Sequence, residues 1–289
     1  MSEPTKPLDA KLLPWIGRTT TGTDIVTSAM LDGFLALLDH EIPPTGASAP
    51  APQGIHWLCA TPRLRARDIG ADGHPHLGLL LPPIELPRRM WAGSAIEFLR
   101  PMRRGDAIER RSTIRSITPK TGSAGPLVFV EVDHSFLAHG EIALQERHTI
   151  VYRSPPDMSR RTGREARREA ELTEAPAMSR TIRPDPVLLF RYSALTFNSH
   201  RIHYDHPYAT EIEGYPGLVV HGPLIATLLL DLAASHYGAN ALKTFSFRGL
   251  APAFADEPLS LQGYPRAGGL HLRAVSGDGR VVVTAEGGL

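Results

Sequence analysis

The sequence has a single cysteine and almost no net charge. Cys59 is the single cysteine among 289 residues, which excludes an internal disulfide and is typical of a reducing compartment. The chain has 31 lysine and arginine residues against 30 aspartate and glutamate residues, and this net charge of +1 argues against binding to nucleic acid or an anionic membrane. We therefore expect neither nucleic acid nor a membrane among its partners.

Long apolar runs and the common nucleotide-binding motifs are missing as well. No apolar run approaches the ~20 residues of a membrane-spanning helix, and residues 1–9 lack the apolar core of a signal peptide, so we expect a cytoplasmic protein. The phosphate-binding patterns GxGxxG and GxxxxGKS/T do not occur, and neither does the GxSxG elbow of many hydrolases. These absences disfavour nucleotide-driven chemistry and Ser-His-Asp hydrolysis.

The apolar pattern divides the chain into two halves of similar order, and 289 residues suit two modest domains. Thr23 and Asp24 are predicted to cap a helix that runs to about Asp39. The remaining predicted helices span 186–197 and 223–236. Strands are predicted at 95–99, 107–117, 127–137, 142–152, 179–183, 243–247, 258–264, 270–275 and 281–285. We infer two α+β units, each a curved antiparallel sheet with helical cover.

Amide, imidazole and carboxylate side chains are concentrated in the stretch SALTFNSHRIHYD at residues 193–205, which is followed by His221-Gly222-Pro223 at a predicted helix start. His203 is the leading candidate for a general acid or base, because the ordinary pKa of histidine lies near neutrality. A histidine that is hydrogen-bonded in a loop for structural reasons is the alternative. The polar neighbours favour the functional interpretation; they include Asn198, His200, Tyr204, Asp205 and His221.

Two further groups could complete a site around His203. The amide of Asn198 can hold a water molecule without titrating, or it can serve as an ordinary turn or cap after the preceding helix. Gly222 lets a ligand approach the backbone closely, and the free N–H groups of a helix start stabilise an oxygen that acquires negative charge. The helix that follows is apolar on all sides, so we expect it to be buried.

Metal binding is the alternative use of the histidines in this stretch. His200, His203 and His206 follow one another at steps of three residues. However, Arg201 lies among them, Pro207 follows at once, and neither a cysteine nor an HExxH pattern accompanies them. We therefore predict no metal and no cofactor.

The segment TFNSHRIHYD at 196–205, with His221-Gly222, resembles the motif of the hot-dog-fold enoyl-thioester hydratases and 3-hydroxyacyl-thioester dehydratases, the MaoC or hydratase 2 group. The resemblance implies that His203 is the catalytic histidine and that the Gly222 N–H binds the thioester oxygen. Asn198 stands where this family usually has aspartate. An amide cannot donate or accept a proton as a carboxylate does, so this departure bears directly on the mechanism.

A second resemblance covers more of the chain. The segments WIGR at 15–18, LPP at 81–83 and LPRRMWAG at 86–93 are similar to the double-hot-dog subgroup, which includes mesaconyl-C4-CoA and itaconyl-CoA hydratases and hydroxyacyl-thioester dehydratase type 2. It implies an α+β double hot-dog with two antiparallel sheets. The expected units are 10–155, non-catalytic and shaping the acyl pocket, a charged linker at 156–174, and 175–289, which carries the hydratase motif.

Together these resemblances imply a hydro-lyase that reversibly hydrates an enoyl-CoA thioester of a C4 or C5 dicarboxylic acid, such as mesaconyl-C4-CoA or itaconyl-CoA. Arg88 and Arg89 could pair with the second carboxylate, or contact CoA phosphates or solvent. The other expected substrate-binding residues are His200, Tyr204 and His221. A 3-hydroxyacyl-ACP dehydratase of fatty-acid synthesis and a non-catalytic acyl-thioester binding module are the alternatives. The partner is an acyl-CoA or acyl-ACP thioester, and the sequence leaves a homodimer open.

Overall fold

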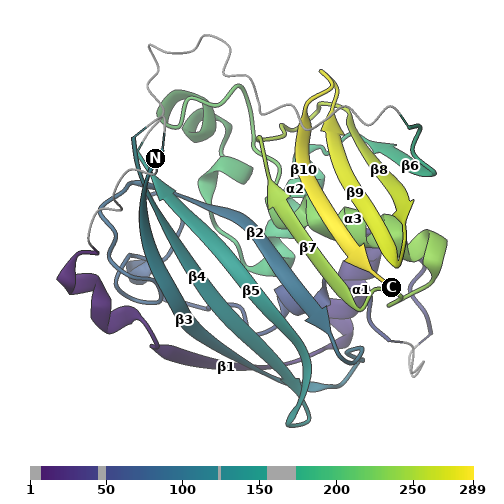
Figure 1. Cartoon of the computed structure of the whole chain (residues 1–289), viewed down its shortest axis with the longest axis horizontal. Coiled ribbons are helices and arrows are strands. Elements are labelled where there is room, and N and C mark those ends of the chain that lie inside the picture. Colours follow the sequence, from purple (N-terminus) through teal and green to yellow (C-terminus); the bar gives the residue numbers. More distant parts are fainter. Residues whose placement is uncertain (1–7, 45–49, 123–124, 155–173) are drawn as a thin grey trace.

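The computed structural model describes residues 8–44, 50–122, 125–154 and 174–289 (Figure 1). Within these ranges ten strands form one antiparallel sheet. The strands are β1 (Thr19–Ile25), β2 (Arg88–Phe98), β3 (Ala107–Gly122), β4 (Gly125–Ala138), β5 (Glu141–Arg153), β6 (Met178–Ile182), β7 (Thr244–Gly249), β8 (Leu259–Arg266), β9 (Gly269–Ser276) and β10 (Val281–Gly288). The α-helices are α1 (Ser28–Leu37), α2 (Pro186–Thr196) and α3 (Gly222–Tyr237).

The sheet has the same strand order in both halves of the chain. Counted from the outer edge inward, the order is β1-β3-β4-β5-β2 in the first half and β6-β8-β9-β10-β7 in the second. The two inner strands, β2 and β7, are hydrogen-bonded to each other, so the two predicted sheets are continuous. Gly93 on β2 permits this pairing, because a Cβ there would overlap the carbonyl of Phe247. The predicted α+β class is confirmed. The predicted linker at 156–174 lies outside the described residues except for Glu174.

The predicted start of the first helix is wrong. Thr23 and Asp24 belong to β1, which pairs with β3, and α1 begins three residues further on. The hydroxyl of Thr27 accepts a hydrogen bond from the N–H of Met30 at 3.1 Å and so caps α1. Asp24 instead accepts a hydrogen bond from the N–H of Ala60 at 3.0 Å. A short polar side chain can either cap a helix or accept a hydrogen bond from a distant loop. For Asp24 the position of Ala60 decides between these roles, and it cannot be read from the local sequence.

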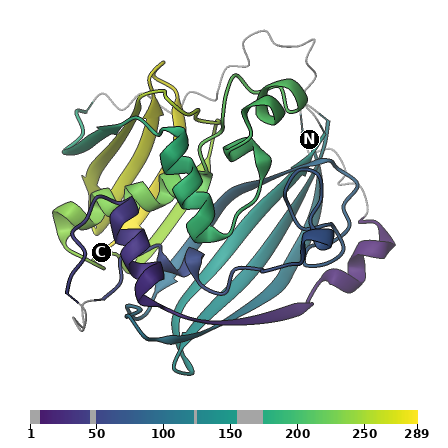
Figure 2. The same ribbon diagram turned by 180° about the vertical axis from the view of Figure 1, so that it is seen from behind.

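The helices all lie on one face of the sheet (Figure 2). Helix α3 is buried from Leu224 to Ala233 and packs on β6, β8, β9 and β10, as its apolar sequence predicts. Its one acidic residue, Asp231, is also buried and accepts hydrogen bonds from His40 at 2.5 Å and Arg180 at 2.7 Å. These two side chains tie the helix to a loop of the first half and to β6.

The described part of the first half has no helix as long as α3. Helix α1 has 10 residues against 16 in α3, and it packs against α2 and the short 3-10 helix η2 (Ile55–Leu58). Much of the inner face of β2 to β5 is therefore covered by the long connection between α1 and β2, not by a helix (Figure 2). None of the described helices is long and apolar enough to cross a membrane.

Candidate active site

A cavity of about 1310 Å³ is lined by residues of both halves of the chain. It exceeds the roughly 300–1,000 Å³ of a typical small-molecule site, so a long ligand can enter it. The polar motif, the start of α3, the loop at 69–76 and the inner face of β2 to β5 all contribute to its wall. The eight site residues predicted from the sequence all line it: His203, Asn198, Gly222, His200, Tyr204, His221, Arg88 and Arg89.

His203 lies in the 3-10 helix η5 (Arg201–His203) and is 7% exposed. Its Nδ1 is 2.7 Å from the carbonyl oxygen of Val219. Since a carbonyl oxygen only accepts, Nδ1 carries the proton and Nε2 keeps its lone pair. Burial lowers the pKa of His203 to about 4, although the hydrogen bond to Val219 opposes this shift. The ring is therefore neutral at pH 7 and can accept a proton at Nε2.

The ring of His221 holds His203 in place. The two imidazoles are stacked with their centroids 3.6 Å apart. His221 is itself fixed by a 2.8 Å hydrogen bond between its Nε2 and the hydroxyl of Ser193 on α2, and by the ring of Tyr192 at 5.1 Å. Burial lowers the pKa of His221 well below its ordinary value, so the stack is uncharged.

The start of α3 opens into the same cavity. No side chain caps this helix, because His221 at the N-cap position makes no capping hydrogen bond. A Cβ at Gly222 would meet no heavy atom within 4 Å, so packing within the protein does not require glycine there. An uncapped helix start beside a neutral imidazole suits a ligand oxygen on which negative charge develops.

The side chain of Asn198 stabilises the turn that follows α2, which is one of the two roles that the sequence allowed. Helix α2 ends at Thr196, and Phe197 follows in the left-handed conformation at φ 50°. The side-chain oxygen of Asn198 then accepts a hydrogen bond from the N–H of His200 at 3.0 Å. Its amide group still lines the cavity, so a role toward a ligand stays a prediction.

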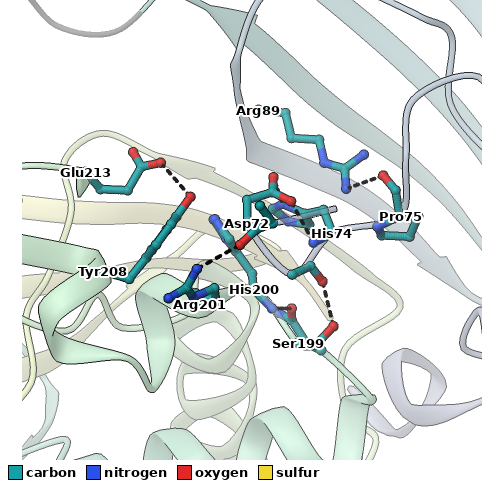
Figure 3. Close-up of polar contacts among 12 residues, drawn as sticks. Asp72, His74, Pro75, Arg89, Ser199, His200, Arg201, Tyr208 and Glu213 are labelled. Carbon is teal, nitrogen blue, oxygen red and sulfur yellow. Dashed lines mark hydrogen bonds and ion pairs between the residues drawn. The ribbon is translucent and has the colours of Figure 1, made fainter. Parts of the chain in front are cut away.

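The sequence analysis missed the loop at 70–76 from the first half, which docks on the motif. The Ser199 hydroxyl donates to the Gly73 carbonyl at 2.5 Å, and the Arg201 N–H donates to the Asp72 carbonyl at 2.9 Å (Figure 3). Next to these contacts, the His74 ring lies 3.9 Å from the ring of His200. The run Asp-Gly-His-Pro at 72–75 was the available signal, since a glycine there separates two side chains able to carry protons.

Asp72 and His74 form a hydrogen-bonded pair, with Oδ2 and Nδ1 3.0 Å apart. Burial raises the pKa of Asp72, but the hydrogen bonds from the side chain and backbone of His74 outweigh it and hold this pKa well below its ordinary value. Burial lowers the pKa of His74, against the effect of Asp72. The site thus has an ionised carboxylate, although Asn198 replaces the one that the motif usually carries.

Asp72, His74 and His200 are also the one group in the described ranges that could hold a metal ion, with ligand atoms within 4.8 Å of one another. The spacing of His200, His203 and His206 does not build a metal site in the described chain, since His203 bonds to Val219 and His206 is exposed. Asp72 and His74 already satisfy each other, so we retain the prediction of no metal.

Arg88, Arg89 and Tyr204 line the outer part of the site. Arg88 pairs with Glu213 at 2.8 Å and also donates to the Glu213 carbonyl at 2.6 Å. Arg89 donates to the Pro75 carbonyl at 3.3 Å (Figure 3). The hydroxyl of Tyr204, which is 48% exposed, donates to the Ser199 carbonyl at 3.2 Å. Arg88 thus has a carboxylate partner before any ligand binds.

Replacing Gly73 by alanine is expected to lower enzymatic activity by about 10²-fold, because the loop and the motif would move apart. Gly73 has φ +86°, and a Cβ there would overlap the Ser199 carbonyl. Gly105 is the matched control: its φ is +87°, but nothing lies within 4 Å of its Cβ position. Each alanine costs about 1–2 kcal/mol of backbone strain. A loss of activity confined to Gly73→Ala would therefore show that the contact between the loop and the motif is required. Equal losses in both variants would contradict it.

Comparison with known proteins defines the class of this protein. Residues 54–255 match the family model of hydroxyacyl-thioester dehydratase type 2. The chain belongs to this family, and the resemblance drawn from its motifs is confirmed. It is 42% identical over 282 residues to the mesaconyl-C(4)-CoA hydratase of Chloroflexus aurantiacus, covering 96% of this chain and 97% of the relative. It is also 29% identical to the mitochondrial hydroxyacyl-thioester dehydratase type 2 of Schizosaccharomyces pombe, over 82% of this chain and 87% of the relative.

Solved structures support the fold. HtdX of Mycobacterium tuberculosis superimposes with a TM-score of 0.68 at 19% identity, covering 94% of this chain and 100% of that one. A second protein of that organism, described as having a double hotdog fold, gives a TM-score of 0.59 at 14% identity over 94% and 95% of the two chains. The predicted α+β double hot-dog fold is confirmed.

Proposed function

We propose that this protein is a hydro-lyase that reversibly adds water across the α,β double bond of an enoyl-CoA thioester, with a C4 or C5 dicarboxylyl-CoA such as mesaconyl-C4-CoA as its substrate. One observation carries the proposal: the neutral imidazole of His203 and the uncapped start of α3 line the same cavity. The relatives named as a mesaconyl-C(4)-CoA hydratase and a hydroxyacyl-thioester dehydratase support the reaction class.

In the proposed reaction, the thioester oxygen accepts a hydrogen bond from the Gly222 N–H. Nε2 of His203 takes a proton from water while the water oxygen bonds to the β carbon and the π bond breaks. Negative charge moves onto the thioester oxygen, where the helix start stabilises it by about 3 kcal/mol. The proton taken up by His203 then passes through His74 to the α carbon, so both rings return to their starting forms, and the other proton of the water stays on the new hydroxyl. Neither step needs a cofactor.

We assign to His74 the second proton-transfer role, with Asp72 as its orienting carboxylate. The pair stands beside His200, and the centroid of the His200 ring is 5.4 Å from that of His203. Asp72 thereby supplies an ionised carboxylate next to the motif, which Asn198 cannot do. Asn198 orients the segment by its turn and can hold the attacking water.

His74→Gln is expected to lower kcat by about 10²-fold with little change in KM, because it removes a proton carrier and not a binding contact. His139→Gln is the matched control and should behave as wild type, because His139 also pairs with an aspartate, Asp106 at 3.1 Å, but is exposed and does not line the cavity. Turnover that is insensitive to EDTA in both proteins would separate proton transfer from metal chemistry. Wild-type kcat in a folded His74→Gln variant would contradict the assignment.

A thioester panel followed by mass spectrometry tests the function directly. Mesaconyl-C4-CoA, itaconyl-CoA, crotonyl-CoA and crotonyl-ACP are incubated with the full chain, and the expected product is heavier by one water. Fastest turnover of crotonyl-ACP would favour a 3-hydroxyacyl-ACP dehydratase instead. A thioester that raises the melting temperature without reacting would indicate a binding module and overturn the proposal.

We further propose that the protein acts in the cytoplasm and that its active site is complete in one chain. The buried thiol of the single cysteine and the cavity built by both halves support this. Association into a homodimer would then leave the specific activity per chain unchanged, which sedimentation and dilution assays can test.

A further inference from the structure

The inner face of the first half carries a group of polar side chains that the reaction does not use. Arg110 and Ser112 lie on β3, His134 on β4, and Glu146 and His148 on β5, and all five line the cavity. Ser112 is paired with His134, and His134 with Glu146, so these three form one row across the strands. The hydroxyl of Ser112 is 2.8 Å from Nδ1 of His134. We name these five residues the inner polar group.

Arg110 is the one cation of this group with no direct partner. Its backbone is paired within the sheet, but its half-buried guanidinium forms no hydrogen bond or ion pair with the described residues. Glu146 is the acid of the group, but its carboxyl accepts hydrogen bonds from Ser94 at 2.6 Å and Trp57 at 3.2 Å. Burial raises the pKa of Glu146, while these hydrogen bonds and the charge of Arg110 oppose the shift, and no hydrogen bond or ion pair joins the two side chains.

The histidines nearby add donors without adding charge. Burial lowers the pKa of His134 to about 3 and that of His148 well below its ordinary value, and Arg110 contributes to both shifts. Nε2 of His148 has no hydrogen-bond partner among the described residues. A guanidinium in a partly desolvated pocket is costly unless an anion joins it, and carboxylate is the anion that its two parallel N–H groups match.

We propose that Arg110, assisted by His134 and His148, binds the second carboxylate of a dicarboxylyl thioester. The inference rests on the proposed function. It differs from the role predicted for Arg88, because Arg88 is already paired with Glu213. Tyr192 lines the same cavity, with its ring 5.1 Å from that of His221.

The test compares kcat/KM for mesaconyl-C4-CoA with kcat/KM for crotonyl-CoA, which has no second carboxylate. Arg110→Gln is expected to lower the ratio of these two values by at least about 10²-fold, and Arg110→Lys is expected to restore part of it. Arg111→Gln is the matched control, because Arg111 is the next residue on β3, is exposed, and pairs with Glu109. That variant should keep the wild-type ratio.

The outcomes separate this inference from the proposed function. An unchanged ratio in Arg110→Gln, with both thioesters hydrated, would overturn the carboxylate site and leave the hydratase intact. If the wild-type protein hydrates neither thioester, the proposed function fails. Calorimetric binding of both thioesters to the wild type and to Arg110→Gln then decides the inference: preferential loss of mesaconyl-C4-CoA binding supports it, and equal binding overturns it.

Discussion

His203→Ala is expected to lower kcat/KM for enoyl-thioester hydration by about 10³-fold, within the range for loss of a general base. The imidazole is neutral at pH 7 because burial lowers its pKa to about 4. Its Nδ1 proton is committed to the Val219 carbonyl, so Nε2 is the atom that accepts the proton of water. No other described side chain combines this burial, this fixed tautomer and this closeness to the start of α3.

The pH dependence of the same reaction follows from that pKa. A base is active when unprotonated, so kcat/KM in the wild type should stay high from pH 8 to about 5 and fall as the pH approaches about 4. His206→Ala is the control, because His206 is exposed and belongs to the same segment. Near wild-type turnover by a His203→Ala protein with an unchanged melting temperature would exclude His203 from the chemistry.

Lowering the pH from 7 to 5 is expected to reduce the free energy of unfolding by several kcal/mol. Burial lowers the pKa of seven described histidines: His56 and His134 to about 3, His203 to about 4, His200 to about 2, His148 and His221 well below the ordinary value, and His74 below it. Unfolded histidine binds a proton below about pH 6.5, and the folded rings do not. The stabilisation is therefore complete above pH 6.5 and is lost as the pH falls towards 4.

The size of this effect follows from proton linkage, at about 1.4 kcal/mol per pH unit for each group. Glu146 opposes it, since its raised pKa lets the folded protein hold a proton that the unfolded chain releases. Urea unfolding at four pH values between 7.5 and 4.5 gives the slope. His56→Phe should reduce the slope by about one proton, and the exposed-site variant His206→Gln should not change it. A stability that is flat between pH 7 and 5 would contradict neutral burial of these rings.

Local sequence information predicted the second half well. Asp185 followed by Pro186 marks the start of α2 because a capping side chain and a preset φ act within a few residues. The apolar run after Gly222 likewise predicted the buried α3. The motif at 193–205 and the corner at 221–223 could be joined in advance because the family resemblance links them.

Contacts between distant parts of the chain were not predictable in the same way. Gly73 and Ser199 meet across 126 positions in sequence, and no local pattern specifies which surface a loop will dock on. For the same reason the sequence did not predict a site at Arg110. Its position in the cavity depends on strand register, and its lack of a partner depends on which groups the neighbouring side chains bind. Asp24 was misassigned because its partner, Ala60, lies 36 residues away.

The shared strand order of the two halves, with one functional motif between them, has an evolutionary consequence. In a dimer of two identical subunits, every mutation alters both copies of a site. Joining the two halves in one chain, with β2 and β7 paired in one sheet, removes that symmetry. One half can then keep the motif histidines and the helix start, while the other, with no helix of that length, contributes a loop to the site and lines the pocket, so that the two parts of the site diversify under separate mutations.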